Sequence, residues 1–297
     1  MLAVAVAALA AAPVARADHH DENLPWPQAL PPLPTPTTPQ PHGVPGCERA
    51  SIACIDRLIV RLRKQWRRLD ATCDHRALFS LAYLEITEGL REDLARPVPG
   101  FFRYRDWMIY LIQDFSNSYF RAFDNYERGR GPVPKAWRMT FDEARSGDAN
   151  GGQDILLASN AHTQHDLPLA MADMGLRTPS GASRKHDHDG VNAINTRVFD
   201  HLEDEFAARY DPSFTLIDAK PSPLDEIGTI EGVKAWREGA WRSAERLVRA
   251  KTPAERRAIE QQLDTSSVAW ANLIRSVELP GWRARRDAFC RSAPPLR

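Results

Sequence analysis

The chain has 297 residues, enough for one large domain or two small ones. Its 39 Lys and Arg residues balance 39 Asp and Glu residues, so the basic footprint typical of nucleic-acid-binding proteins is absent. Hydrophobic residues make up 43% of the chain, which is ample for a packed core. These bounds favour a globular protein that has no nucleic-acid partner.

Residues 1–17 look like a secretory signal peptide. An apolar run of Leu, Ala and Val extends from Leu2 to Ala12, and Ala15-Arg16-Ala17 fits the small-x-small cleavage pattern. No Lys or Arg precedes the run, which departs from the usual signal. The run is too short for a permanent membrane anchor. We therefore expect a secreted, extracellular protein that is cleaved after Ala17.

Residues 18–46 are rich in proline, which disfavours helices and favours extended polyproline geometry. We expect a disordered Pro-rich linker over 18–46, followed by one folded domain over 47–297. The prolines are Pro25, Pro27, Pro31, Pro32, Pro34, Pro36, Pro39, Pro41 and Pro45.

The chain has four cysteines, an even number that suggests two disulfides in an exported protein. Four cysteines allow three pairings, and the sequence alone does not choose among them. We favour Cys47–Cys54, which closes a short loop, and Cys73–Cys290, which ties the C-terminus to the first helical hairpin. Buried thiols are the alternative.

The expected domain shows apolar residues at spacings of three and four, the pattern of amphipathic helices. Strict apolar–polar alternation, the pattern of half-buried strands, is rare. The sequence predicts an all-α fold, a single antiparallel helical bundle with additional helices. The expected helices cover residues 52–69, 74–90, 104–126, a short segment around 137–141, 154–174, 191–210, 230–249 and 253–278.

Histidines and carboxylates cluster in two segments of this domain. His162 and Asp166 stand four residues apart in an apolar stretch, so on a helix they share one face roughly 6 Å apart. About twenty residues later comes a second cluster, 186–192, with His188 and Asp189. Polar groups on a buried face need partners, because an unpaired buried polar group is costly. We place the candidate site here.

Helical bundles often hold metals between facing helices. His162, Asp166, His188 and Asp189 are the expected metal ligands, and this donor set suits zinc, iron or manganese. Asp189 has an alternative role as the N-cap of the helix predicted from residue 191. Asp187 is expected to be exposed, and the role of His165 stays open.

Other groups could complete such a site. Glu85 and Asp114 each lie inside an apolar helix, where they either face the site or belong to a polar outer face. Asp166 or Glu85 would then act as general base beside a metal-bound water. Arg237 either packs in the core with an ion pair to Glu245 or lines the cavity and meets an anionic substrate.

Four segments carry a resemblance. Cys73-Asp74-His75-Arg76-Ala77, Asn160-Ala161-His162 with Asp166-Leu167-Pro168, the run 187–192, and the stretch 236–245 resemble an uncharacterised family of exported actinobacterial proteins, known as a domain of unknown function. The resemblance spans most of residues 47–275. It implies an all-helical fold and a shared pocket, and it implies no reaction.

Two hypotheses of different class follow, and whether the protein is an enzyme stays open between them. The first is a secreted metal-dependent hydrolase acting on a small-molecule or anionic substrate. The second is a non-catalytic extracellular binding or structural module, whose His/Asp cluster is a buried hydrogen-bond network. A third, less favoured hypothesis is a metal-free enzyme that uses His162 and Asp166 as an acid/base dyad. The sequence does not indicate the substrate or the oligomeric state.

Overall fold

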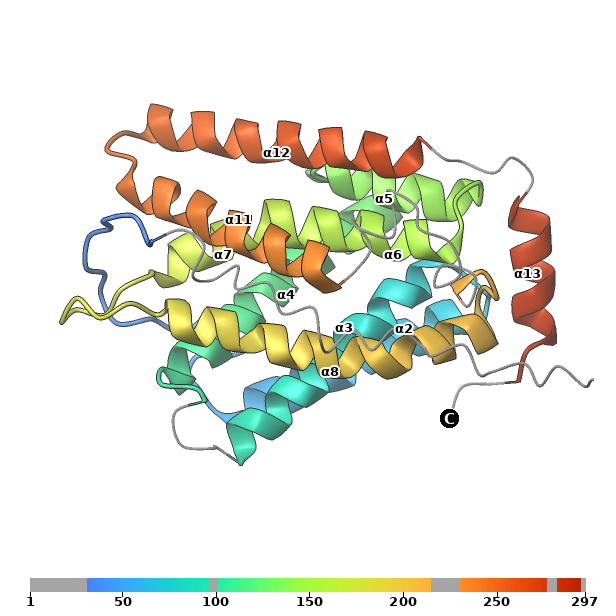
Figure 1. Cartoon of the computed structure of the whole chain (residues 1–297), viewed down its shortest axis with the longest axis horizontal. Helices are drawn as coiled ribbons and strands as arrows, with labels where there is room; N and C mark the ends of the chain where they lie inside the picture. Colours follow the sequence, from blue (N-terminus) through green and yellow to red (C-terminus); the bar gives the residue numbers. More distant parts are fainter. Residues whose placement is uncertain (1–30, 97–100, 215–229, 277–281, 295–297) are drawn as a thin grey trace, which may run out of the picture.

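The computed structural model describes residues 31–96, 101–214, 230–276 and 282–294 (Figure 1). These residues form helices and no strand, with isolated β-bridges only at Val44–Cys47 and Arg177–Ser183. The predicted all-α class is therefore confirmed. The expected signal peptide, residues 1–17, lies outside the described residues, as does the first part of the expected linker.

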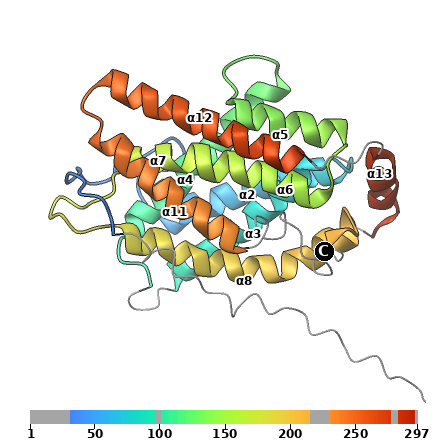
Figure 2. The ribbon, with the colours of Figure 1, turned by 45° about the horizontal axis from the view of Figure 1, so that its top comes forward.

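The helices pack as a bundle around one central segment. Helices α6 and α7 and the π-helix η1 between them follow one another without a break, and α3, α4, α5, α11 and α12 contact η1 or its flanking helices. Figures 1 and 2 show α12 along the upper edge of the bundle, with α11 between α12 and α8. The bounds are α2 Ile52–Asp70, α3 Arg76–Ala95, α4 Arg105–Glu127, α5 Lys135–Ser146, α6 Gly151–Asn160, η1 Ala161–Asp166, α7 Leu167–Met174, α8 Lys185–Arg209, α11 Ile230–Arg249, α12 Pro253–Arg275 and α13 Trp282–Ser292.

Local sequence explains several helix starts. Asn150 and Gln153 form a capping box that begins α6, because each side chain binds the other's backbone N–H. Thr252 caps α12 by accepting from the Glu255 N–H at 3.1 Å, and Pro253 follows at the first helical position. These signals set the starts of α6, which leads into η1, and of α12, which contacts η1.

Two helices outside the central segment of α6, η1 and α7 differ from the sequence prediction. Helix α8 begins at Lys185 and not at residue 191, because the polar run 185–190 continues the helix through Gly190. Phe102 lies 3.4 Å from where a Cβ on Gly190 would stand, so this glycine permits close packing. Helix α13 was not predicted. None of the described helices has the length and apolarity needed to cross a bilayer.

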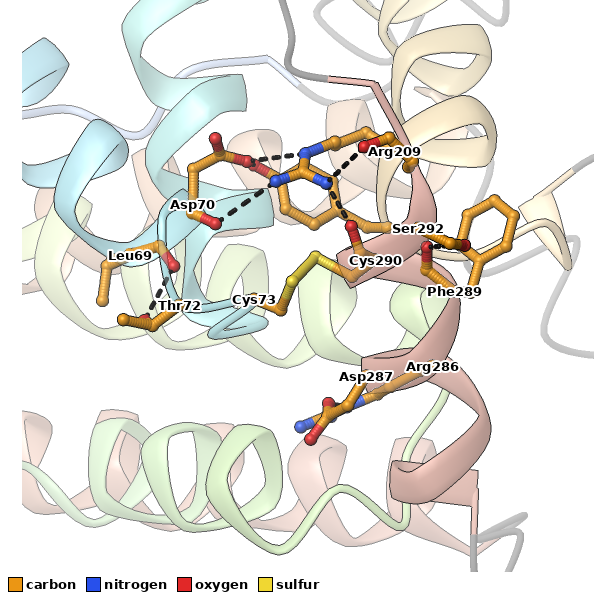
Figure 3. The surroundings of a disulfide bond; sticks show 12 residues. Leu69, Asp70, Thr72, Cys73, Arg209, Arg286, Asp287, Phe289, Cys290 and Ser292 are labelled. Atoms are coloured by element: carbon orange, nitrogen blue, oxygen red, sulfur yellow. Dashed lines mark hydrogen bonds and ion pairs between the residues drawn. A yellow bond between two sulfur atoms is a disulfide. The ribbon is translucent and has the colours of Figure 1, made fainter.

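Two disulfides join the chain in the favoured pairing, Cys47–Cys54 and Cys73–Cys290. The second attaches α13 to the turn between α2 and α3 (Figure 3). Arg209, at the end of α8, reinforces this junction: it donates to the Cys290 carbonyl and, at 3.1 Å, to Asp70 Oδ1. Trp282 Nε1 donates to Asp211 Oδ2 at 3.3 Å and Arg286 Nη2 to the Ala144 carbonyl at 2.8 Å, so α13 is held by a disulfide and by several hydrogen bonds.

Residues 31–46 of the expected linker lie along the bundle without helical structure (blue in Figure 1). The Leu33 N–H donates to Glu245 Oε1 at 3.0 Å, and Arg177 Nε donates to Thr35 Oγ1 at 3.0 Å. The side chain of Val44 is buried. This part of the chain therefore packs against the helical domain.

The two disulfides close loops of very different length, with sequence separations of 217 and 7. We expect the Cys73→Ser/Cys290→Ser variant to lose about 2–5 kcal/mol of unfolding free energy, because the long loop is no longer restricted in the unfolded chain. Urea denaturation measures the loss, and the Cys47→Ser/Cys54→Ser variant is the matched control with a smaller expected loss. Equal losses for the two variants would contradict the loop-length argument.

Candidate functional site

A cavity of about 90 Å³ lies inside the bundle, between α3, α4, η1, α8 and α11. Helices α3 and α4 supply an apolar wall that includes Phe79, Tyr83, Ile112 and Phe115. Helix α6, η1, α8 and α11 add a small number of polar side chains, which are Ser159, His162, Thr163, His188, Asn195 and Arg237. A mostly apolar cavity with a few converging polar groups is the usual form of a small-molecule site.

Asp166 is the buried anchor of the histidine cluster. Its Oδ2 accepts hydrogen bonds from Trp137 Nε1 at 2.7 Å and His162 Nδ1 at 3.1 Å, and its Oδ1 accepts from His165 Nδ1 at 2.8 Å. Burial alone would raise the pKa of Asp166, but the hydrogen bonds from the two histidines outweigh it and lower the pKa to about 2. Asp166 is therefore a carboxylate at neutral pH.

His162 is held between Asp166 and a group of aromatic rings. Its imidazole stacks on Phe115 with centroids 3.5 Å apart, and Tyr83 approaches edge-on at 4.8 Å. Burial lowers the pKa of His162, against the opposing effect of Asp166, so the ring is neutral at pH 7. Because a carboxylate only accepts, Nδ1 carries the proton and Nε2 keeps its lone pair. Nε2 is buried and has no hydrogen-bond partner among the described residues.

His165 lies in the same π-helix, η1, and binds the second oxygen of Asp166. Burial lowers the pKa of His165, but the hydrogen bond and charge of Asp166 prevail and raise it. Short π-helical segments frequently occur at functional sites. The sequence predicted a regular helix here and did not reveal the π-helix.

His188 repeats this arrangement on α8. Its Nδ1 donates to Asp189 Oδ1 at 3.0 Å, and its buried Nε2 has no partner within the described part of the chain. Burial and the positive charge of Arg237 lower the pKa of His188 to about 4. Lys185 Nζ, from the first turn of α8, binds both oxygens of Asp189 at 2.9 Å. The N-cap interpretation of Asp189 is wrong, because α8 begins four residues earlier.

Arg237 brings a positive charge to the cavity wall. Its Nε donates to Asn192 Oδ1 at 2.7 Å, and its Nη2 donates to the His188 carbonyl. Burial lowers the pKa of Arg237 to about 10, and the charge of Asp189 opposes this shift. The ion pair expected with Glu245 is replaced by one between Glu245 and Arg242 at 3.4 Å.

The predicted site residues separate into two groups. His162, His188 and Arg237 line the cavity. Asp166 and Asp189 do not line it and instead bind the Nδ1 atoms of the two histidines. No three His, Cys, Asp or Glu side chains of the described residues are arranged to hold a metal ion. The geometry therefore does not assemble the four expected ligands into one metal centre.

Glu85 and Asp114 also lie away from the cavity lining. Glu85 faces His201 on α8, with Oε2 and Nε2 3.8 Å apart. Burial raises the pKa of Glu85 and of Asp114, and neighbouring carboxylates add to both shifts. Neither carboxylate is placed to act as a base on a molecule in the cavity.

Three further residues shape the site and were missed. Asp187 was expected to be exposed, but it is fully buried and accepts from the N–H groups of Arg103 and Tyr104 just before α4. Trp137 binds Asp166 from α5, and no local sequence signal indicates that contact. Asn195 lines the cavity two helical turns after His188, so its spacing of seven residues was the available signal.

The low pKa of Asp166 predicts a specific loss of stability in acid. The folded-state value of about 2 lies below the unfolded value of 3.8, so the ionised form stabilises the fold above pH 4 and this stabilisation disappears as pH falls towards 2. We expect Asp166→Asn to lower the unfolding free energy by about 2 kcal/mol at pH 7 and to flatten its decrease between pH 4 and pH 2. Urea denaturation across this pH range measures both effects. Parallel curves for the two proteins would contradict the assignment.

A family model described as "Family of unknown function (DUF5995)" matches residues 55–277. The match covers more than half of the chain and includes His162, Asp166, His188 and Arg237. No curated protein and no solved structure matches the chain.

Proposed function

The chain belongs to the DUF5995 family, whose function is unknown, and we propose that it is a binding protein for a small, mostly apolar molecule that donates hydrogen bonds. The ligand occupies the cavity between α3, α4, η1, α8 and α11. The observation that carries the proposal is the pair of buried Nε2 atoms, on His162 and His188, that have no partner in the described structure.

An unsatisfied buried polar atom costs about 1–3 kcal/mol, so most are paired in folded proteins. Here two such atoms belong to rings that line the same cavity. Asp166 and Asp189 fix the protons on Nδ1, so both Nε2 atoms are hydrogen-bond acceptors. A ligand hydroxyl or N–H group would satisfy them, while its apolar body fills the space beside Phe79, Ile86 and Leu111.

The metal-dependent hydrolase is the less supported alternative. A catalytic zinc site normally uses three protein ligands, and the described residues contain no group of three. The two carboxylates expected as ligands are engaged elsewhere, Asp166 by three donors and Asp189 by Lys185 and His188. The binding function uses the groups that line the cavity, with Asp166 and Asp189 in the positions that they occupy.

We also propose that the protein acts outside the cell, after cleavage behind Ala17. The support is the pair of disulfides, because such bonds persist mainly in oxidising compartments.

Filling the cavity should abolish binding without harming the fold. Ala82 is buried on α3 and lines the cavity, so Ala82→Leu places apolar atoms in the ligand's space. We expect phenol, a small apolar probe with one donor, to bind the wild type in calorimetry and not to bind this variant, whose melting temperature is equal or higher. Ala95→Leu is the matched control, because Ala95 is exposed on the same helix. Unchanged phenol binding to Ala82→Leu would place the ligand elsewhere.

Removing the acceptor that phenol uses should erase the preference for a hydrogen-bond donor. We expect the wild type to bind phenol more tightly than toluene. Because phenol has one donor, we expect either His162→Phe or His188→Phe to reduce this preference by up to about tenfold, the value of one hydrogen bond, and the double variant to remove it. Toluene affinity should change little, since phenylalanine keeps a flat ring. Calorimetry with both probes measures the ratio, and a phenol preference unchanged in both variants would contradict the role of Nε2.

A further inference from the structure

Arg237 is a buried cation that lacks a carboxylate partner among the described residues. Both of its hydrogen-bond acceptors are neutral, the Asn192 side chain at 2.7 Å and the His188 carbonyl. A buried charge is costly unless an opposite charge compensates it. The side chain also lines the cavity, so a molecule bound there can reach it.

Neighbouring cations show a different pattern. Lys185 is paired with Asp189 at 2.9 Å and with Glu238 at 2.7 Å. Arg242, five residues after Arg237 on α11, is paired with Glu238 at 2.7 Å and with Glu245. The carboxylates near this end of the cavity therefore bind other cations. The charge of Asp189 acts on Arg237, but the oxygens of Asp189 bind Lys185 and His188, so Arg237 faces the cavity without a hydrogen-bonded carboxylate from the described residues.

We infer that the ligand of the proposed binding protein is a small carboxylate with an apolar body, and that its carboxylate binds the guanidinium of Arg237. The inference rests on the proposed function, which supplies the cavity and its occupant. A guanidinium matches the two oxygens of a carboxylate and is the side chain best suited to bind one at a buried site.

The rest of the cavity limits the size and polarity of this acid. Its volume of about 90 Å³ is that of a small site, and aliphatic and aromatic side chains form most of its wall. Asn195, also on the wall, has a buried Oδ1 without a partner in the described structure, and this oxygen, like the Nε2 atoms of the two histidines, only accepts a hydrogen bond. A small aromatic or short aliphatic acid that carries a hydroxyl or N–H donor besides its carboxylate meets these conditions.

The test compares benzoate with nitrobenzene, a neutral molecule of nearly the same shape that, like benzoate, has no hydrogen-bond donor, by calorimetry at pH 7.5 on the disulfide-bonded protein. We expect the wild type to bind benzoate at least tenfold more tightly than nitrobenzene. Arg237→Gln should remove this preference and leave nitrobenzene affinity within about threefold, since one buried charge pair is lost. Arg237→Lys should keep part of it, because the charge remains without the planar fork.

Arg246→Gln is the control for general electrostatics, because Arg246 is an exposed arginine on the same helix. This variant should retain the full preference for benzoate. A similar loss in Arg246→Gln and Arg237→Gln would overturn the inference, since the attraction would then be long-range. If Arg237→Gln fails to fold, the partial preference of Arg237→Lys decides the question.

The outcomes separate the inference from the proposed function. Binding of phenol and nitrobenzene with no advantage for benzoate overturns the carboxylate assignment and leaves the binding function standing. If phenol, nitrobenzene and benzoate all fail to bind, both proposals are overturned.

Discussion

The site depends on the hydrogen bonds that the buried carboxylate of Asp166 accepts. This carboxylate accepts from Trp137 on α5 and from His162 and His165 on η1, so it joins neighbouring elements through hydrogen bonds to a full negative charge. Such bonds are roughly twice as strong as neutral ones. They fix the proton of His162 on Nδ1 while the stacked Phe115 ring fixes the imidazole plane. The chemical character of Nε2 therefore follows from a residue that does not line the cavity.

His188 also lines the cavity while a carboxylate outside the cavity fixes its tautomer, and this arrangement has a consequence for stability. Asp189 sets the tautomer, Lys185 holds Asp189, and the ring edge lies at the cavity. The Nε2 atoms of His162 and His188 have no hydrogen-bond partner among the described residues, and the Arg237 guanidinium has no carboxylate partner among them. These buried groups lower the stability of the ligand-free protein. Proteins retain such costly groups where function needs them, and the long disulfide and the Arg209 junction offset part of this cost.

Periodicity predicted most helices because burial of one face is a local property of the sequence. It placed His162 and Asp166 on one face, and their hydrogen bond agrees with that spacing. Other features depend on tertiary contacts: Trp137 reaches Asp166 from α5, and a disulfide holds α13. The predicted start of α8, residue 191, was too late because glycine normally disfavours a helix interior. In the structure Gly190 lies inside α8, and its lack of a side chain leaves room for Phe102. The spacing of residues along the sequence predicts which side chains share a face of a helix. It does not predict which hydrogen-bond partner each polar side chain has in the folded protein.

The charged side chains of helix α11 differ in whether they have a partner of opposite charge. Arg242 and Glu245 are paired with each other, and both also contact the extended segment at Pro31 and Leu33. Arg237, less than two turns earlier, has only neutral acceptors and faces the cavity. An internal carboxylate opposite Arg237 would neutralise this charge and would also occupy or hydrate the apolar space. The absence of such a carboxylate from the described wall keeps the space open and lets the charge of a bound molecule complete the ion pair.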